Sequence, residues 1–136
     1  MELPGTVLFL CPHNAAKSVI AAAYFDIMAI ERGLPFRADS AGTEPDDHPW
    51  PAVIAALQAD DIDVAGYRPH HVTAEDLAHA HRVISLGCTL DDLAPSTVQV
   101  DHWDDVPPPS RGLEASRAAI MRRMDTLVAE LADRGQ

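Results

Sequence analysis

Short apolar runs alternate with longer amphipathic stretches along this chain, and the two patterns predict different elements. Runs that are short, apolar or alternating, and partly β-branched predict four strands, at residues 6–10, 36–41, 82–86 and 97–100. Apolar residues at helical spacing predict helices at residues 17–32, 51–59 and 113–133. A fourth, short helix is expected after Thr73, with Asp76 as an imperfect capping-box partner.

The order of these elements predicts an α/β fold with one four-stranded parallel sheet and helices on both faces, because strands that alternate with helices pair in parallel. We expect the 136 residues, 1–136, to form a single domain that buries its own core. In sheets of this kind, ligands bind at the carboxyl ends of the strands, near a switch in strand order. Cys11, directly after the first strand, lies where a ligand is expected.

The charge balance narrows the classes of partner. Lys and Arg number 10 against 21 Asp and Glu, which gives a formal net charge of −11 and argues against nucleic-acid binding. Two cysteines are too few for a disulfide framework, and neither a signal peptide nor a membrane span is evident, so we expect a cytoplasmic location. None of the seven histidines forms a zinc pattern with cysteines, so no metal and no cofactor is assigned.

The segment from Cys11 to Ser18 carries the candidate chemistry, because it joins a predicted strand to a predicted helix. Backbone N–H groups in such a turn, together with the helix N-terminus, bind tetrahedral oxyanions and stabilise a thiolate. A thiolate there is a nucleophile for a phosphorus or arsenic centre. The predicted phosphate-binding residues are Pro12, His13, Asn14, Ala15, Ala16, Lys17 and Ser18.

Individual side chains suit this interpretation. Lys17 is the only lysine in the chain and supplies a positive charge six residues after the cysteine. Asn14 tolerates a left-handed backbone and can brace the loop with its amide. Ser18 can donate a hydrogen bond to the thiolate or cap the helix. The alternative is a buried structural Cys11 at a strand end, with Lys17 solvated on the first helical turn.

The stretch VLFLCPHNAAKSVIAAAYF, residues 7–25, resembles the opening of the low-molecular-weight protein tyrosine phosphatases and of the thioredoxin-coupled arsenate reductases that share their fold. The motif of that family is Cys-x5-Arg-Ser, often with Asn three residues after the Cys. Further similar segments follow in the same order over nearly the whole chain, at residues 39–43, 62–64, 68–70, 83–86 and 102–105. The resemblance implies a flavodoxin-like strand order 2-1-3-4.

The resemblance also implies roles for particular residues. Cys11 would be the nucleophile, Lys17 would stand in for the arginine that clamps the oxyanion, and Asp104 or Asp105 would protonate the leaving group. Two departures bear on this. The first is that lysine is a point charge without the planar fork of arginine. The second is that the family's acid is usually followed directly by a proline, whereas neither Asp104 nor Asp105 is. The alternative is that both aspartates are solvated loop residues.

Four further side chains leave alternatives open. Cys88 is the candidate redox partner: it would form a disulfide with Cys11, or a small thiol such as mycothiol or glutathione would act instead. A relay of three cysteines is impossible with two, and Cys88 is otherwise a small buried residue. His13 would add a donor to the anion, hinder it, or face solvent. Trp50 and Trp103 would flank the pocket or anchor the packing.

Three functional hypotheses follow. The first is a phosphatase-like enzyme that cleaves phosphotyrosine or a small aryl phosphate with the Cys11 thiolate. The second is an arsenate reductase that uses Cys11 with Cys88 or a small-thiol reductant. The third is a protein that binds phosphate or a phosphorylated partner without turnover, since fold alone does not fix function.

Overall fold

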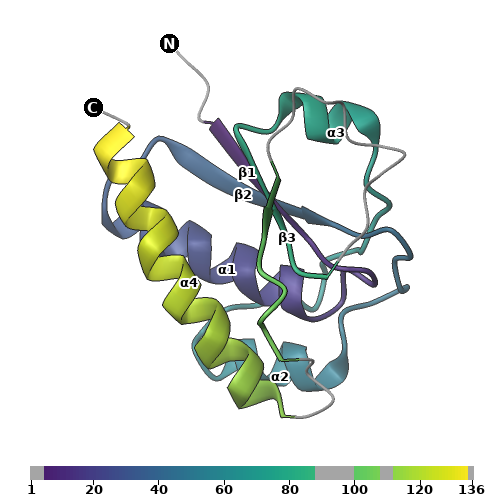
Figure 1. Cartoon of the computed structure of the whole chain (residues 1–136). Coiled ribbons are helices and arrows are strands. Elements are labelled where there is room, and N and C mark those ends of the chain that lie inside the picture. The colour runs from purple at the N-terminus through teal and green to yellow at the C-terminus, as the bar shows by residue number, and fades with distance from the viewer. Residues whose placement is uncertain (1–4, 88–99, 108–111, 135–136) are drawn as a thin grey trace.

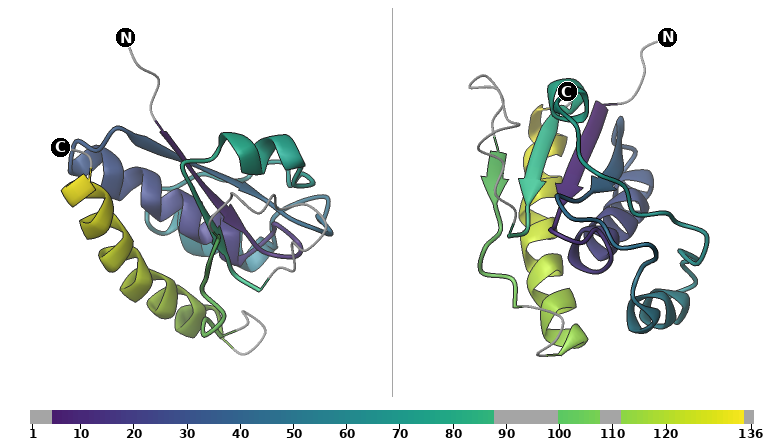
Figure 2. Two further views of the ribbon diagram at one scale, coloured as in Figure 1. Left: turned by 45° about the horizontal axis from the view of Figure 1, so that its top comes forward. Right: turned by 90° about the vertical axis from the view of Figure 1, so that its right-hand side faces the viewer.

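The computed structural model describes residues 5–87, 100–107 and 112–134, and it has the predicted α/β architecture (Figure 1). Its strands are β1 (Gly5–Leu10), β2 (Phe36–Ala41), β3 (Arg82–Ser85) and β4 (Val100–His102). Their order is β2-β1-β3-β4 and every pairing is parallel, which confirms the expected flavodoxin-like order. The right-hand view of Figure 2 shows the arrows of β1, β3 and β4 pointing the same way. The carboxyl ends of the strands therefore meet at one edge of the sheet.

Helices cover both faces of the sheet, as predicted. They are α1 (Lys17–Glu31), α2 (Pro51–Gln58), α3 (Ala74–His79) and α4 (Leu113–Arg134). Alternate residues of a strand point to opposite faces, so Val7 and Phe9 join a larger core with residues of α1, α2 and α4. Leu8 joins a smaller core with Leu77 of α3 on the other face. On the larger face α4 packs against α1 (Figure 1).

The fourth strand differs from its prediction. Residues 97–99 lie outside the described residues, and the described strand continues through Asp101 and His102, which the sequence pattern assigns to a loop. These residues pair in register with β3, and Asp101 accepts a hydrogen bond from Arg82 Nε at 2.7 Å. Backbone pairing and this ion pair hold polar residues in the strand, because strand formation depends more on neighbours than on intrinsic preference.

The helix ends follow their sequences closely. The capping box at the start of α3 is complete, because Thr73 Oγ1 accepts from the Asp76 N–H and Asp76 Oδ2 accepts from the Thr73 N–H, both at 3.0 Å. The aspartate therefore serves where glutamate or glutamine is usual.

Within the described residues, none of the helices combines the length and the apolar character that a transmembrane segment needs.

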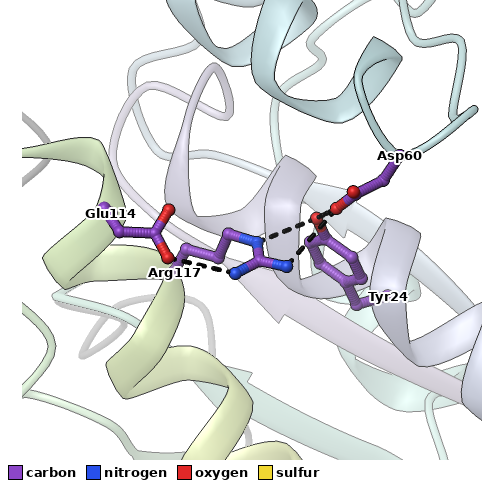
Figure 3. A network of polar contacts seen from close by, with 4 residues as sticks. All are labelled: Tyr24, Asp60, Glu114 and Arg117. Atoms are coloured by element: carbon purple, nitrogen blue, oxygen red, sulfur yellow. Dashed lines mark hydrogen bonds and ion pairs between the residues drawn. The ribbon is translucent and has the colours of Figure 1, made fainter.

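A cluster of four polar side chains ties three helices together (Figure 3). The Tyr24 hydroxyl of α1 donates to Asp60, two residues after the end of α2. Arg117 of α4 donates from Nε to the Tyr24 oxygen at 3.0 Å and pairs with Asp60 at 3.4 Å and with Glu114 at 3.2 Å. Burial raises the pKa of Tyr24, so its hydroxyl stays protonated at neutral pH. The cluster therefore fixes the carboxyl end of α2. At the other end of this helix, Trp50 donates its backbone N–H to Ala15 of the Cys11–Ser18 loop.

Candidate active site

Cys11 lies at the centre of the carboxyl edge of the sheet. It directly follows β1, and the strand order reverses there, because β2 lies on one side of β1 and β3 on the other. Ligands of open α/β sheets bind at this kind of position. Only 3% of Cys11 is exposed, and its backbone N–H donates to the carbonyl of Ala41 at 3.4 Å. The thiol is thus held at a buried point of the sheet edge.

The loop that follows is anchored by its carbonyl groups. The carbonyls of Pro12, His13 and Ala15 accept hydrogen bonds at 2.7, 2.9 and 3.0 Å from backbone N–H groups of the segment 44–50. The three contacts tie the loop along its outer side to the chain that leads into α2. Because the C=O and N–H groups of a planar trans peptide point in opposite directions, the following N–H groups are turned away from that segment.

Four backbone donors of the loop are left for a ligand. The N–H groups of His13, Ala15, Ala16 and Lys17 donate to no atom of the residues that the structure describes. Helix α1 begins here without a side-chain N-cap, and its first turn holds no acidic residue. Clustered N–H groups at a helix N-terminus bind anions. The loop therefore has the geometry of the predicted oxyanion site.

Gly42 allows the loop to lie close to the end of β2. A Cβ atom at this position would stand 2.6 Å from the carbonyl oxygen of Pro12 and 2.8 Å from that of Cys11. Both distances are shorter than any side-chain carbon tolerates, and both neighbours are backbone atoms that cannot move aside. Gly42 enters the sequence analysis only within the similar segment 39–43, with no role assigned to it. Its packing role depends on a contact that no local pattern signals.

The backbone N–H and the hydroxyl of Ser18 both contact the Cys11 sulfur. The Ser18 N–H donates to Sγ at 3.3 Å, and the Ser18 hydroxyl lies 3.0 Å from Sγ. Asn14 Nδ2 donates to the Ser18 oxygen at 2.9 Å, which leaves the hydroxyl proton free to point at the sulfur. Of the two roles considered for Ser18, the structure supports the contact with the sulfur, because α1 has no side-chain cap.

The orientation of Asn14 is fixed from the far side of the loop. Its Oδ1 accepts from the backbone N–H of His70 at 3.0 Å and from the Tyr67 hydroxyl at 2.9 Å. A main-chain N–H can only donate, so the oxygen must face His70 and the NH₂ must face Ser18. Asn14 is fully buried with a φ of 49°, which confirms the left-handed backbone and the bracing amide.

Tyr67 is a residue that sequence reasoning did not single out. Its hydroxyl also lies 2.6 Å from Ser40 Oγ, so it joins β2 to the loop through Asn14. Burial raises the pKa of Tyr67, which keeps the hydroxyl protonated throughout the neutral range. The network from Tyr67 through Asn14 and Ser18 to Cys11 is therefore a chain of intact donors and acceptors.

Lys17 reaches across the edge of the sheet to the end of β3. A Cβ atom at Gly87 would stand 3.5 Å from Lys17 Nζ, so the ammonium lies against that glycine. Gly87 adopts a φ of 97°, which favours glycine. Lys17 is partly buried and forms no ion pair with the described residues. Its charge is thus available to an anion beside the neighbouring strand end.

His13 braces the loop from outside. Its Nδ1 lies 3.1 Å from the carbonyl oxygen of Glu44 and 3.5 Å from Asp46 Oδ1, and half of its side chain is exposed. The other carboxylate oxygen of Asp46 accepts from Trp50 Nε1 at 3.2 Å. The imidazole nitrogen Nδ1 therefore faces the segment before α2, which favours a bracing role over that of an anion ligand.

The two tryptophans both anchor packing. Trp50 donates its backbone N–H to Ala15 and precedes α2, so it couples that helix to the loop. Trp103 is 5% exposed, with its ring centroid 6.0 Å from that of Phe9 in the larger core. This supports the packing alternative for both residues.

The candidate acids lie on an exposed turn just after β4. Asp104 and Asp105 are both exposed, and Asp105 pairs with Arg123 of α4 at 2.7 Å. Asp104 contacts no charged group of the described residues. Since β4 is separated from β1 by β3, this turn lies two strands from Cys11 along the same edge.

Two further predictions, on a redox partner and on metal ligands, concern residues outside the loop. Cys88, the candidate redox partner, lies outside the described residues, although the preceding Gly87 lies beside Lys17. Over residues 5–87, 100–107 and 112–134, no three His, Cys, Asp or Glu side chains gather to hold a metal ion.

Known proteins resemble this chain in sequence and in fold. A Halobacterium salinarum protein, provisionally named an arsenate reductase, is 26% identical over 111 residues, which cover 80% of this chain and 78% of that protein. The crystal structure of YfkJ from Bacillus subtilis superposes with a TM-score of 0.87 at 24% identity, covering 98% of both chains. The low molecular weight protein tyrosine phosphatase of T. tengcongensis superposes with a TM-score of 0.77 at 20% identity, covering 96% of this chain and 99% of that one. At these identities the two structures show a shared fold.

The family model identifies the group to which the fold and the loop belong. The model for low molecular weight phosphotyrosine protein phosphatases matches residues 6–134, from the first strand to the last helix. That match contains the Cys11–Ser18 loop, the braces around it and the turn with Asp104 and Asp105. The chain belongs to the low molecular weight phosphotyrosine protein phosphatase family.

Proposed function

We propose that this protein is a phosphatase-like enzyme in which the Cys11 thiolate attacks a phosphate monoester, phosphotyrosine or a small aryl phosphate, bound in the Cys11–Ser18 loop. The observation that carries the proposal is the convergence of donors. The Ser18 N–H and hydroxyl meet at the sulfur, and four loop N–H groups remain for the oxygens of an anion. Such an arrangement favours both a thiolate and a tetrahedral oxyanion at one place.

The reaction would proceed in two steps. In the first, a Cys11 S–P bond forms while the P–O bond to the leaving group breaks, and Asp104 or Asp105 supplies the proton that the leaving oxygen takes. In the second, water attacks the phosphorus, the S–P bond breaks, and inorganic phosphate leaves with the thiolate restored. The loop N–H groups would stabilise the equatorial oxygens in both transition states.

Lys17 would supply the positive charge for which the family uses arginine. Its ammonium lies over Gly87, next to the strand that carries Cys11, so it can neutralise charge on the bound oxyanion. It lacks the fork that binds two oxygens at once. Loss of one preorganised donor from an oxyanion site costs about 3 kcal/mol, or roughly a hundredfold in rate, so we expect reduced but measurable activity.

Arsenate reduction is the second candidate. The Halobacterium salinarum relative and the presence of Cys88 favour it, because Cys88 directly follows the glycine that contacts Lys17. Here Cys11 would form an S–As bond to arsenate with loss of water. A second thiol, from Cys88 or a small-thiol reductant, would then attack the Cys11 sulfur. Arsenic(V) leaves as arsenic(III) with two electrons, and the two thiols become a disulfide.

Turnover of p-nitrophenyl phosphate by the wild-type protein and by Cys11→Ser tests the first candidate. We expect phosphate release that is abolished in Cys11→Ser and retained in Cys88→Ser. Phosphate binding without any Cys11-dependent release would contradict the phosphatase proposal and indicate a binding protein. Arsenate reduction coupled to a thiol, lost in Cys11→Ser, would favour the second candidate. If it persisted in Cys88→Ser, a small thiol would be the partner of Cys11.

A further inference from the structure

Strand β2 has one free edge. It pairs with β1, and within the described residues no strand lies along its other side. The carbonyl of Pro35 accepts from the Gly5 N–H of β1 at 2.9 Å, so odd-numbered residues of this segment direct their backbone groups toward β1. Because these directions alternate along a strand, the N–H and C=O groups of Phe36, Ala38 and Ser40 point to the free edge. Such a row of backbone groups can pair with a strand of another chain.

Side chains of the protein itself occupy several of these groups. Asp26 Oδ1 of α1 accepts from the Ala38 N–H at 2.7 Å, and Asp39 Oδ1 accepts from the Ser40 N–H at 2.8 Å. The Ser40 carbonyl accepts from the Tyr67 hydroxyl at 3.0 Å. Asp26 thus takes the central donor of the edge, in the place where the carbonyl of a neighbouring strand would otherwise bond.

The middle of the edge is closed by these side chains and not by close packing. A cavity of about 240 Å³ lies beside it, and the lining includes residues 38–40 of β2 and two small side chains of α1, Ala22 and Ala23. Asp26 also lines this cavity and is only partly buried. Another strand can therefore reach Ala38 once the Asp26 carboxylate releases its N–H.

The sequence of β2 is complementary to itself about Ala38. When two copies pair antiparallel with Ala38 opposite Ala38, Arg37 of each copy lies opposite Asp39 of the other. The two side chains lie on one face of the sheet, because they are two residues apart. Opposite charges at directly opposed positions stabilise paired strands. The two Ala38 residues would exchange both of their backbone hydrogen bonds.

Two exposed isoleucines of α1 lie next to this edge. Among the described residues, Ile27 and Ile30 are the large hydrophobic residues that are exposed, at 38% and 62%. They follow by one helical turn Ala23, which lines the cavity, and Asp26, which bonds to β2. The two-fold axis of such a strand pair is perpendicular to the sheet, so the α1 helices of both copies lie on the same face. Pairing would bring these isoleucines toward each other and remove apolar surface from water.

We infer that the free edge of β2 is an interaction surface for a second copy of this chain, and that Asp26 keeps this surface closed. Pairing moves the Ala38 N–H from the Asp26 carboxylate to the Ala38 carbonyl of the second copy, and it does so in both copies. A hydrogen bond to a charged group is worth about tenfold in an equilibrium constant. The two Asp26 bonds therefore weaken dimerisation of the wild-type protein by about a hundredfold relative to Asp26→Ala.

Molar mass measured by sedimentation over a range of protein concentrations tests the role of Asp26. We expect monomeric wild-type protein and Asp26→Asn, and a doubling of the molar mass in Asp26→Ala at about a hundredfold lower concentration. Asp26→Asn is the matched control, because it removes the same charge but keeps an oxygen that accepts from Ala38. Asp26→Val, which also lacks an acceptor, repeats the test if circular dichroism shows that Asp26→Ala is unfolded.

Two results of the sedimentation experiment would overturn the role of Asp26. One is a folded Asp26→Ala or Asp26→Val protein that stays monomeric wherever Asp26→Asn does. The other is wild-type protein that dimerises as tightly as Asp26→Ala.

A charge exchange tests the register of the pairing. In the Asp26→Ala background, Arg37→Asp puts carboxylates opposite each other, and Asp39→Arg does the same with guanidinium groups. Each variant alone should be monomeric, and their equimolar mixture should dimerise about as tightly as Asp26→Ala itself. Arg122→Asp in the same background is the control, because it makes the same change at an exposed arginine of α4 and should leave the dimer intact. A mixture that does not dimerise, or single variants that dimerise as well as the control, would overturn the pairing about Ala38.

Discussion

The Cys11–Ser18 loop and the Trp103–Pro107 turn lie at the same edge of the sheet, yet they are built differently. In the loop, a buried asparagine, a buried serine and three outward carbonyls all have partners, and the free donors face one place. In the turn, both aspartates are exposed, and among the residues that the structure describes only Asp105 has a partner, through a largely exposed ion pair. The loop is therefore preorganised by its own buried contacts, whereas the turn is anchored at its two ends, by the Trp103 N–H on Ser85 and by Ser116 on the Pro107 carbonyl.

Replacing Asn14 by alanine should break the loop most severely. The change leaves the His70 N–H without its acceptor, the Tyr67 hydroxyl keeps only its contacts with Ser40, and the Ser18 hydroxyl loses the donor that orients it. We expect the free energy of unfolding to fall by about 2–4 kcal/mol and turnover to fall by about a hundredfold or more. Urea unfolding and steady-state kinetics measure the two losses.

The same measurements on the turn sharpen the contrast. Arg123→Gln removes a largely exposed ion pair and should change the free energy of unfolding by less than about 1 kcal/mol. Equal destabilisation by Asn14→Ala and Arg123→Gln would show that the two regions do not differ in preorganisation.

Variants of Lys17 test the charge that the loop holds beside β3. Lys17→Met should lower turnover about a hundredfold, because it removes the only cationic side chain within the loop. Lys17→Arg should maintain or raise turnover, because a guanidinium adds a second donor to the oxyanion. Steady-state rates with p-nitrophenyl phosphate compare the three proteins. A large loss in Lys17→Arg would indicate that the site is built around an ammonium.

Gly42→Ala tests the close approach of the loop to β2. The added methyl would stand 2.6 Å from the Pro12 oxygen, so the loop must shift, at a cost of about 1–3 kcal/mol in the free energy of unfolding. Gly66→Ala is the matched control, because nothing lies within 4 Å of a Cβ at that position. We expect that control to keep the wild-type stability within about 0.5 kcal/mol. Similar losses at both glycines would show that the contact does not constrain the loop.

Tyr67→Phe should have a smaller effect than Asn14→Ala, because Asn14 keeps the main-chain donor of His70. We expect a loss of about 1 kcal/mol in the free energy of unfolding and a few-fold loss in turnover. The pKa of Tyr67 is raised in the folded protein, so its contribution is complete below the unfolded pKa of about 10 and is lost as the pH rises through the folded value. The difference in stability between wild type and Tyr67→Phe should therefore be constant from pH 6 to about 9 and shrink above about pH 10. A difference that grows at high pH would contradict this linkage.

Periodicity predicts most of this fold, because α1, α2 and α4 and the first three strands bury one face or lie wholly in the core. Local motifs likewise predict the Cys11–Ser18 loop and the left-handed backbone of Asn14. The sequence pattern does not predict the extent of β4, because Asp101 and His102 are polar and are held in the strand by pairing with β3.

The contacts that hold the Cys11–Ser18 loop from other segments could not be predicted from the sequence pattern either. Tyr67 lies 53 residues from Asn14 in the chain, and the contact of Gly42 with Pro12 is visible only once two strand ends meet. A sequence carries no local signal for such contacts. The direction of the His13 ring was open for the same reason, because Glu44 and Asp46 reach it from a different segment.

The most direct test of the central claim is to look for a phosphoryl group on Cys11 during turnover. Rapid acid quenching of the protein with p-nitrophenyl phosphate, followed by peptide mass spectrometry, locates a covalent phosphocysteine. Our account predicts a phosphorylated peptide that contains Cys11, formed within the first turnover and absent from Cys11→Ser. Release of phosphate with no adduct at Cys11, and at an undiminished rate in Cys11→Ser, would contradict it.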